Sequence, residues 1–133
     1  MRILKAILCG VSVGSLGLAT GPVSAHHSFS MFDYQHPTRW EGVVEKFMWV
    51  SPHVQIIFTA TDPQHHGHWQ VEGAAPNIMS RQGWNHSSFM PGDKITIVGF
   101  PMKDGSQAGS LYYALDAHGN KLYHDVQRRP GVS

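Results

Sequence analysis

Histidine offers the clearest chemistry in this sequence, which has ten His among 133 residues. His26 and His27 directly follow Ala25, where we expect a leader to be removed. A His at the start of a chain presents its α-amine and its ring Nδ1 to one metal ion. The amine titrates at about 7.7–8.0, so a metal can displace its proton near neutral pH. The imidazole ring of a further His residue completes a site of nitrogen ligands only, which suits copper, zinc or nickel.

His53 is the donor that we expect from the folded body, because it follows Pro52 at the start of an expected strand. His26 with His53, and His27 as an additional donor, predicts a copper site similar to the N-terminal histidine brace of exported copper proteins. A structural interpretation stays open beside this one. In it, the two N-terminal His residues are a solvated chain start and the His53 ring hydrogen-bonds to backbone.

The other seven His residues are expected at the surface. His65, His66 and His68 share a turn-rich segment that can attract metals without a built site. The remaining four, in loops or at strand ends, are interpreted as polar surface: His36, His86, His118 and His124.

An aromatic groove is the alternative site, and it belongs to a different class of function. In this hypothesis a small β-barrel recognition module binds a small molecule, a glycan or a protein partner. The residues expected to contact that ligand are Trp40, Trp49, Trp69, Trp84 and Asn77. Asn77 stands at an expected helix start, so it is also interpreted as a helix cap.

Motifs of metal-independent catalysis are missing from the sequence. There is no G-x-S-x-G elbow, no Ser/His/Asp spacing typical of a triad and no Gly-rich phosphate loop after a strand. We therefore expect a non-enzymatic metal-binding protein. A copper-dependent redox enzyme built on the same site is a third alternative.

The first 25 residues have the features of a secretory signal peptide. Arg2 and Lys5 precede an apolar run over residues 6–20, and small residues end the segment at Ala25. We expect cleavage there and a periplasmic or secreted protein without a membrane anchor. Cys9, the single Cys, lies in this leader, so the mature chain would hold neither a disulfide nor a thiolate site.

Charge is nearly balanced, with ten Lys and Arg against nine Asp and Glu in the full chain. No basic stripe or run precedes the Arg128-Arg129 tail. We therefore expect no nucleic-acid partner.

The elements that must position these residues are mostly strands. Apolar alternation between turn signals predicts them over residues 40–49, 53–60, 68–72, 94–100, 110–116 and 121–123, with a short helix within 74–83. Residues expected to face inward include Val54, Ile56, Phe58, Ile78, Met79, Trp84, Ile95, Ile97, Leu111, Tyr113 and Leu115, whereas Glu41, Glu45 and Glu72 are expected to face solvent.

This order of elements predicts an all-β, mainly antiparallel protein. It is the order of a five- to six-stranded OB-like barrel with one short helix between strands 3 and 4. An open two-sheet β-sandwich is the alternative. We expect one domain over residues 26–126, with an N-terminal arm over 26–39 and a disordered tail over 127–133.

Several separated motifs carry a family resemblance. They are His26-His27-Ser28-Phe29, Trp49-Val50-Ser51-Pro52-His53, Gly73-Ala74-Ala75-Pro76-Asn77, Gly83-Trp84 and Pro91-Gly92-Asp93. Together they resemble a bacterial family of small exported proteins of unknown function. The resemblance implies a periplasmic, mainly β protein and no established activity.

Overall fold

The computed structural model describes residues 29–125. The element order is η1 (Phe29–Met31), β1 (Thr38–Met48), β2 (Gln55–Ala60), β3 (Gly67–Glu72), α1 (Pro76–Met79), η2 (Ser80–Gln82), β4 (Lys94–Pro101), β5 (Ala108–Leu115) and β6 (Lys121–Tyr123). All six expected strands are present, and the short helix lies between strands 3 and 4 as predicted.

The strands form a closed five-stranded barrel with β6 as an extra strand. The order along the sheet is β3-β2-β1-β4-β5-β6, and a further pairing of β3 with β5 closes it. That closing pair is parallel, whereas every other strand pair is antiparallel. The OB-like barrel is therefore confirmed, and the open sandwich is not the fold.

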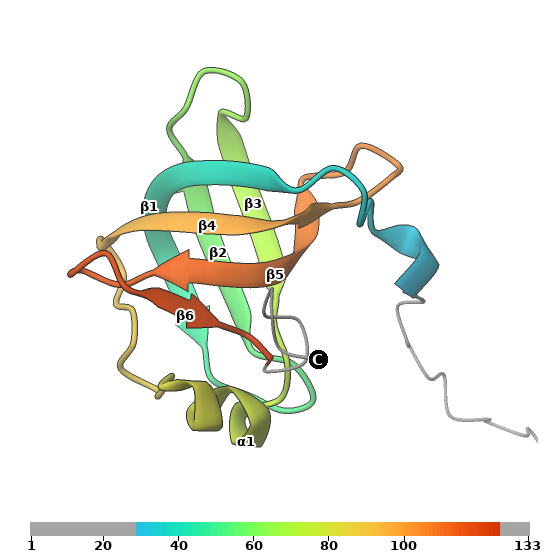
Figure 1. Ribbon diagram of the computed structural model, residues 1–133. Helices are drawn as coiled ribbons and strands as arrows, with labels where there is room; N and C mark the ends of the chain where they lie inside the picture. Colours follow the sequence, from blue (N-terminus) through green and yellow to red (C-terminus); the bar gives the residue numbers. More distant parts are fainter. Residues whose placement is uncertain (1–28, 126–133) are drawn as a thin grey trace, which may run out of the picture.

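The two ends of the barrel differ. Figure 1 shows α1 across one end, near the β1–β2 connection, and the β2–β3 turn at the opposite end. The segment before β1 is anchored beside the β4–β5 turn, where Phe32 bridges to Met102 and the Asp33 amide donates to the Pro101 carbonyl oxygen at 2.8 Å.

The core is formed by residues at alternate positions of the strands, which face inward, as the sequence predicts for β2 and β4. Val54, Ile56, Phe58, Ile95 and Ile97 are all buried. Trp40 lies across β4 and β5 where those strands carry Gly99 and Gly109. A Cβ at Gly99 would be 3.1 Å from Cζ3 of Trp40, so glycine gives the indole its room.

Two expectations of inward packing are wrong. Tyr113 and Leu115 are only half-buried, and Ala114 takes the inward position, because a register shift opposite Val98 and Gly99 inserts Tyr112 as an extra residue. Ile78 is 38% exposed, since the single turn of α1 directs Met79 to the core instead.

A glycine inside a strand, such as Gly42 in β1, often marks a bend or a bulge. The bulge lies between Val44 and Lys46, and Gly42 is required for another reason. A Cβ at this position would overlap the backbone carbonyl oxygen of Thr59 on β2, so only glycine permits the close approach of these strands.

Candidate functional site

His53 stands at the end of the barrel that α1 covers. His53 is exposed, and its ring Nδ1 lies 3.0 Å from the carbonyl oxygen of Gly73. Since a carbonyl oxygen only accepts, Nδ1 carries the proton and Nε2 keeps its lone pair. Metal-binding His residues usually have this arrangement, in which a backbone carbonyl fixes the ring and the tautomer.

The backbone around Gly73 holds that carbonyl in place. The Gly73 amide donates to the Val54 carbonyl at 2.8 Å, and the Val54 amide donates to the Ala74 carbonyl at 3.0 Å, which extends the β2–β3 ladder past both strand ends. Met79 packs directly on Gly73, where a Cβ would be 2.7 Å from its sulfur. The orientation of His53 thus depends on the buried contacts of its neighbours.

A cavity of about 260 Å³ opens beside His53. It lies between the N-terminal arm, the β1–β2 connection and the segment that follows β3. Its described lining residues are Phe32, Tyr34, Pro52, His53, Glu72, Gly73, Ala74, Ala75, Ile78, Ser110, His124 and Asp125. Residues distant in sequence therefore share one recess with the predicted metal ligand.

Two residues of this recess were interpreted differently from the sequence. Glu72 was expected to face solvent but is half-buried, because the arm residue Phe32 covers the outer face of the β3–β5 seam. His124 was expected at the surface but is 8% exposed. No sequence pattern predicts the burial of Glu72 or His124, since both depend on where the arm and the last strand lie.

His26 and His27 lie outside the described residues, as do the expected signal peptide and tail. Within residues 29–125 no group of three His, Cys, Asp or Glu side chains is placed to hold a metal ion. Of the predicted ligands, only His53 lies within the described residues, where Gly73 orients its ring. Within the same range, no helix has the length and apolar character of a membrane span.

The His residues of the β2–β3 turn are far from His53. Six residues of β2 separate the two ends of the barrel, a rise of about 20 Å. His65 is not a plain surface residue: its Nδ1 lies 2.6 Å from Asp62 Oδ1, and its ring packs against Trp40 and Trp69. His68 Nδ1 pairs with Glu45 at 2.7 Å, and His66 is exposed.

Carboxylates beside these rings have lowered pKa values. Burial raises the pKa of Asp62. The hydrogen bonds that its carboxylate accepts from the His65 side chain and from backbone amides lower the pKa, and together they outweigh burial, so the net shift is downward. Hydrogen bonds from Thr59 and His68 lower the pKa of Glu45.

The tryptophans of the predicted groove do not form one exposed surface. Trp40, Trp69 and Trp84 are core residues, and the Trp84 indole donates to the Tyr123 carbonyl at 2.9 Å. Trp49 is half-buried against Phe47.

Asn77 is exposed within α1, where it was expected to cap the helix. The N-cap residue is Ala75, and no side chain caps this helix. The interpretation of Asn77 as a helix cap is therefore wrong.

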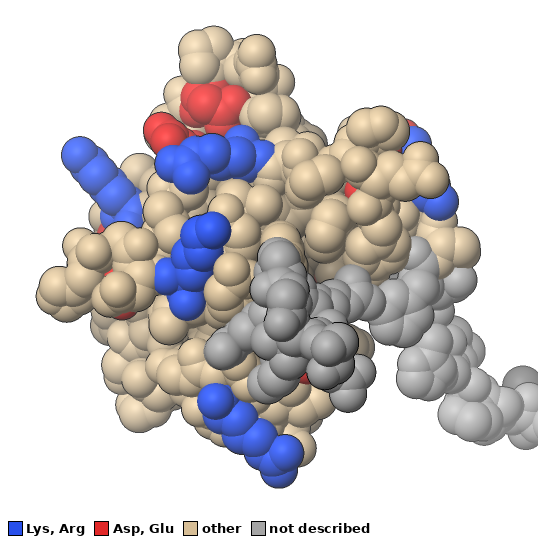
Figure 2. Space-filling model, in the orientation of Figure 1, with Lys and Arg blue, Asp and Glu red and all other residues tan. Residues whose placement is uncertain are grey.

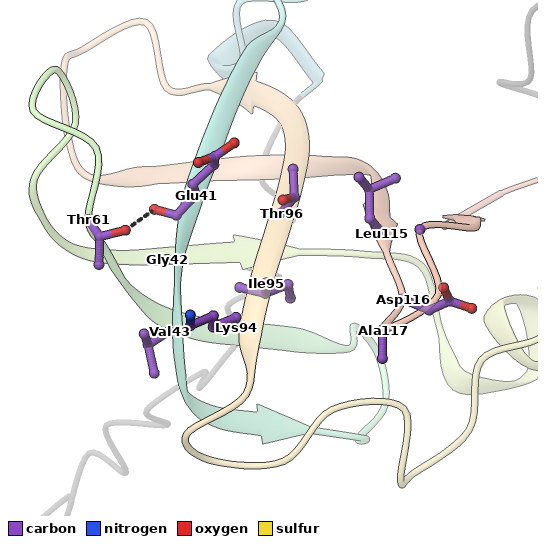
Figure 3. A pocket seen from close by; sticks show the side chains of 11 residues that line it. Glu41, Gly42, Val43, Thr61, Lys94, Ile95, Thr96, Leu115, Asp116 and Ala117 are labelled. Carbon is purple, nitrogen blue, oxygen red and sulfur yellow. Dashed lines mark hydrogen bonds between the residues drawn. The ribbon is translucent and has the colours of Figure 1, made fainter.

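A larger hollow than the one beside His53 lies on the outer side of β1 and β4. It measures about 570 Å³, and Figure 3 shows its side chains spread along two strands and the turn after β5. Lys94 accompanies Glu41 and Asp116, so the hollow carries both charges. None of the predicted site residues lies in it. Figure 2 likewise shows Lys and Arg at separate places on the face it presents.

The sequence model of a family of unknown function, DUF6152, matches residues 15–111. No curated protein and no solved structure matches the chain significantly. The resemblance to a family of unknown function is thereby confirmed. The matched stretch includes β1 to β4, the cavity residues from Phe32 to Ser110, and His53. The chain belongs to the DUF6152 family.

Proposed function

We propose that this protein binds a transition metal, with copper foremost, and that it does so as a periplasmic or secreted protein. The metal site consists of the α-amine and ring of His26 together with Nε2 of His53, and His27 is an additional donor. Zinc and nickel suit the same nitrogen donors. The single observation that carries the proposal is the hydrogen bond from His53 Nδ1 to Gly73, which leaves Nε2 available on a fixed ring.

The chain length between the arm and His26 permits this site. Phe32 lines the same cavity as His53. His26 lies six positions before Phe32, and an extended segment of that length spans about 20 Å. The N-terminal donors can thus reach a metal at His53 without any change in the barrel.

The aromatic recognition module receives less support in the form that the sequence suggested. Three of its four Trp side chains are used in packing the core. A binding role for the same end of the barrel rests on other residues and is argued below.

Copper affinity of two chains that differ by one residue tests the proposal. One chain begins at His26 and the other has a Gly before it, which turns the α-amine into an amide. Cu(II) is titrated against a competing chelator, because exposed imidazoles bind copper nonspecifically. We expect the extended chain to bind at least tenfold more weakly. Equal affinities would overturn the N-terminal site.

Side-chain variants locate the second donor. In the chain that begins at His26, His53→Ala should weaken binding and leave a residual complex that depends on His26. The matched control is His118→Ala, an exposed His in the turn after β5. Replacing His66 and His68 together is a second control that leaves the His65–Asp62 pair intact. A loss with these controls as large as that with His53→Ala would exclude His53 as a specific ligand.

A further inference from the structure

The cavity beside His53 holds acceptor groups without a cationic partner. Glu72 is half-buried, and its carboxylate makes no hydrogen bond or ion pair within residues 29–125. Nε2 of His53 is an acceptor as well, because Nδ1 is the protonated nitrogen. Glu72 supplies a negative charge to the described lining, which contains neither Lys nor Arg, whereas Asp125, which also lines the recess, has an interaction partner of its own. The recess therefore favours a ligand that is positively charged and donates hydrogen bonds.

The remaining walls are apolar or aromatic. Phe32, Pro52, Ala74 and Ile78 contribute carbon surface, and Tyr34 stands edge-on to Phe32 with ring centroids 6.0 Å apart. Aromatic faces attract cations, and a partly desolvated contact contributes more than an exposed one. A second cavity of about 160 Å³ shares Phe32 and Glu72, so both residues border space on two sides.

We propose that this recess binds a small organic cation, namely a primary ammonium group on a short apolar or aromatic body. The ammonium donates to the Glu72 carboxylate and to His53 Nε2, and the body lies against Phe32 and Ile78. The volume of about 260 Å³ lies below the range of about 300–1,000 Å³ that is usual for drug-sized ligands. The ligand is accordingly a small amine. This binding requires neither a metal ion nor His26, so it goes beyond the proposed copper site.

Three probes of similar shape and different charge test the proposal: benzylammonium, benzyl alcohol and phenylacetate. Each is titrated into the metal-free protein in the presence of EDTA, and binding is followed by amide chemical shifts in nuclear magnetic resonance spectra. We expect benzylammonium to bind at least tenfold more tightly than the other two, with the largest shifts at residues 32–34, 53–54 and 72–75. Equal or tighter binding of phenylacetate, or shifts elsewhere, would overturn the proposal.

Glu72→Gln removes the charge and keeps the shape of the side chain. It should weaken benzylammonium binding about tenfold. The matched control is Glu41→Gln, which changes an exposed carboxylate in the other hollow. Equal losses in the two variants would show nonspecific attraction and contradict the proposal. The probe comparison on the unaltered protein remains decisive if a variant folds poorly.

Copper titrations of the same proteins separate the two proposals. Glu72→Gln should keep the affinity for Cu(II), and the chain with Gly before His26 should keep the affinity for benzylammonium. If the amine fails to bind while copper affinity still depends on the free N-terminus, only the organic-cation site is rejected. The reverse result rejects only the copper site.

Discussion

The His side chains differ in their hydrogen-bond partners, which the sequence alone does not reveal. His36, His65 and His68 each place Nδ1 against a carboxylate, of Asp33, Asp62 and Glu45. His53 places Nδ1 against a neutral carbonyl. The first three rings thus belong to ion pairs whenever they are protonated, whereas the Nδ1 partner of His53 carries no charge.

The Asp62–His65 contact predicts a pH-dependent stability. The pKa of Asp62 is lowered in the folded protein. Such a carboxylate stabilises the fold above its unfolded pKa of about 3.9, and the contribution is lost as pH falls through the lower folded value. Asp62→Asn should therefore destabilise the protein at pH 7, and the difference from the unaltered protein should shrink towards pH 3. Urea unfolding, followed by the fluorescence of nearby Trp40 and Trp69, measures both.

His65→Gln is the companion variant because it retains the carboxylate and removes its main side-chain donor. It should also reduce the pH-dependent part of the stability. A destabilisation by Asp62→Asn that is as large at pH 3 as at pH 7 would show that shape, and not charge, is what matters at this turn.

Two glycine-to-alanine substitutions compare the cost of crowding with the cost of backbone strain. Gly99→Ala would bring a Cβ against the Ser110 carbonyl oxygen and the Trp40 ring, so β4 or β5 must move. We expect a loss of about 3 kcal/mol in the free energy of unfolding. Gly119→Ala meets no atom within 4 Å but has a φ of 82°, and its strain should cost about 1 kcal/mol. Equal losses in chemical denaturation would contradict this separation of crowding from backbone strain.

The sequence predicts a strand and its buried face best where the buried residues stand at alternate positions. Val54, Ile56 and Phe58 occupy alternate positions, and this period of two identified β2 and its buried face correctly, although Ile57 between them is apolar as well. In β5 the residues from Leu111 to Leu115 are all apolar or aromatic, so alternation could not reveal the extra residue at Tyr112. The bulge became visible only in the pairing with β4.

The site was predictable only in part, for a related reason. Pro52-His53 at a strand start correctly placed His53 on the folded body, but its partner Gly73 is twenty residues away. Glu72 follows the outward phase of β3, and that phase indicates solvent unless another segment covers the strand. The position of Phe32 over this seam comes from contacts of the arm with the β4–β5 turn, which no local pattern encodes.

The edge strand β6 pairs with β5, and the indole of Trp84 adds a second connection between β6 and the core. The Trp84 Nε1 donates to the Tyr123 carbonyl at 2.9 Å, and Phe47 and Phe89 surround the ring. Trp84→Phe should lose about 2–3 kcal/mol of stability, because it leaves that carbonyl without its donor and removes buried volume. Amide hydrogen exchange in residues 121–124 should accelerate more than in β1.

Trp49→Phe is the matched control for this prediction. Trp49 is half-buried against Phe47, and its indole nitrogen makes no hydrogen bond within the described residues. The control should leave exchange in β6 unchanged. Faster exchange in both variants would mean that ring packing, and not the hydrogen bond, retains the strand.

At the scale of the whole molecule, the barrel separates two groups of histidines. His53 and the 260 Å³ cavity lie at the α1 end, whereas His65, His66 and His68 lie at the β2–β3 turn. Since β2 is a rigid spacer between them, a metal at the turn cannot share ligands with His53. In the proposed copper site the further donors come from the N-terminal segment, and Phe32, the described residue nearest to them in this lining, borders the cavity.

Removal of the expected leader after Ala25 therefore decides whether the proposed copper site can form. We expect a chain expressed with its leader in a bacterium with a periplasm to be cut after Ala25, because Val23-Ser24-Ala25 has the small residues that such cleavage requires. Intact mass of the periplasmic protein should correspond to residues 26–133. Ala25→Leu should block or shift the cut and abolish the high-affinity copper complex, whereas an Ala117→Leu control in an exposed turn should alter neither. A periplasmic chain that begins at His27 or later would lack the His26 amine, and the copper site would then have to be rejected.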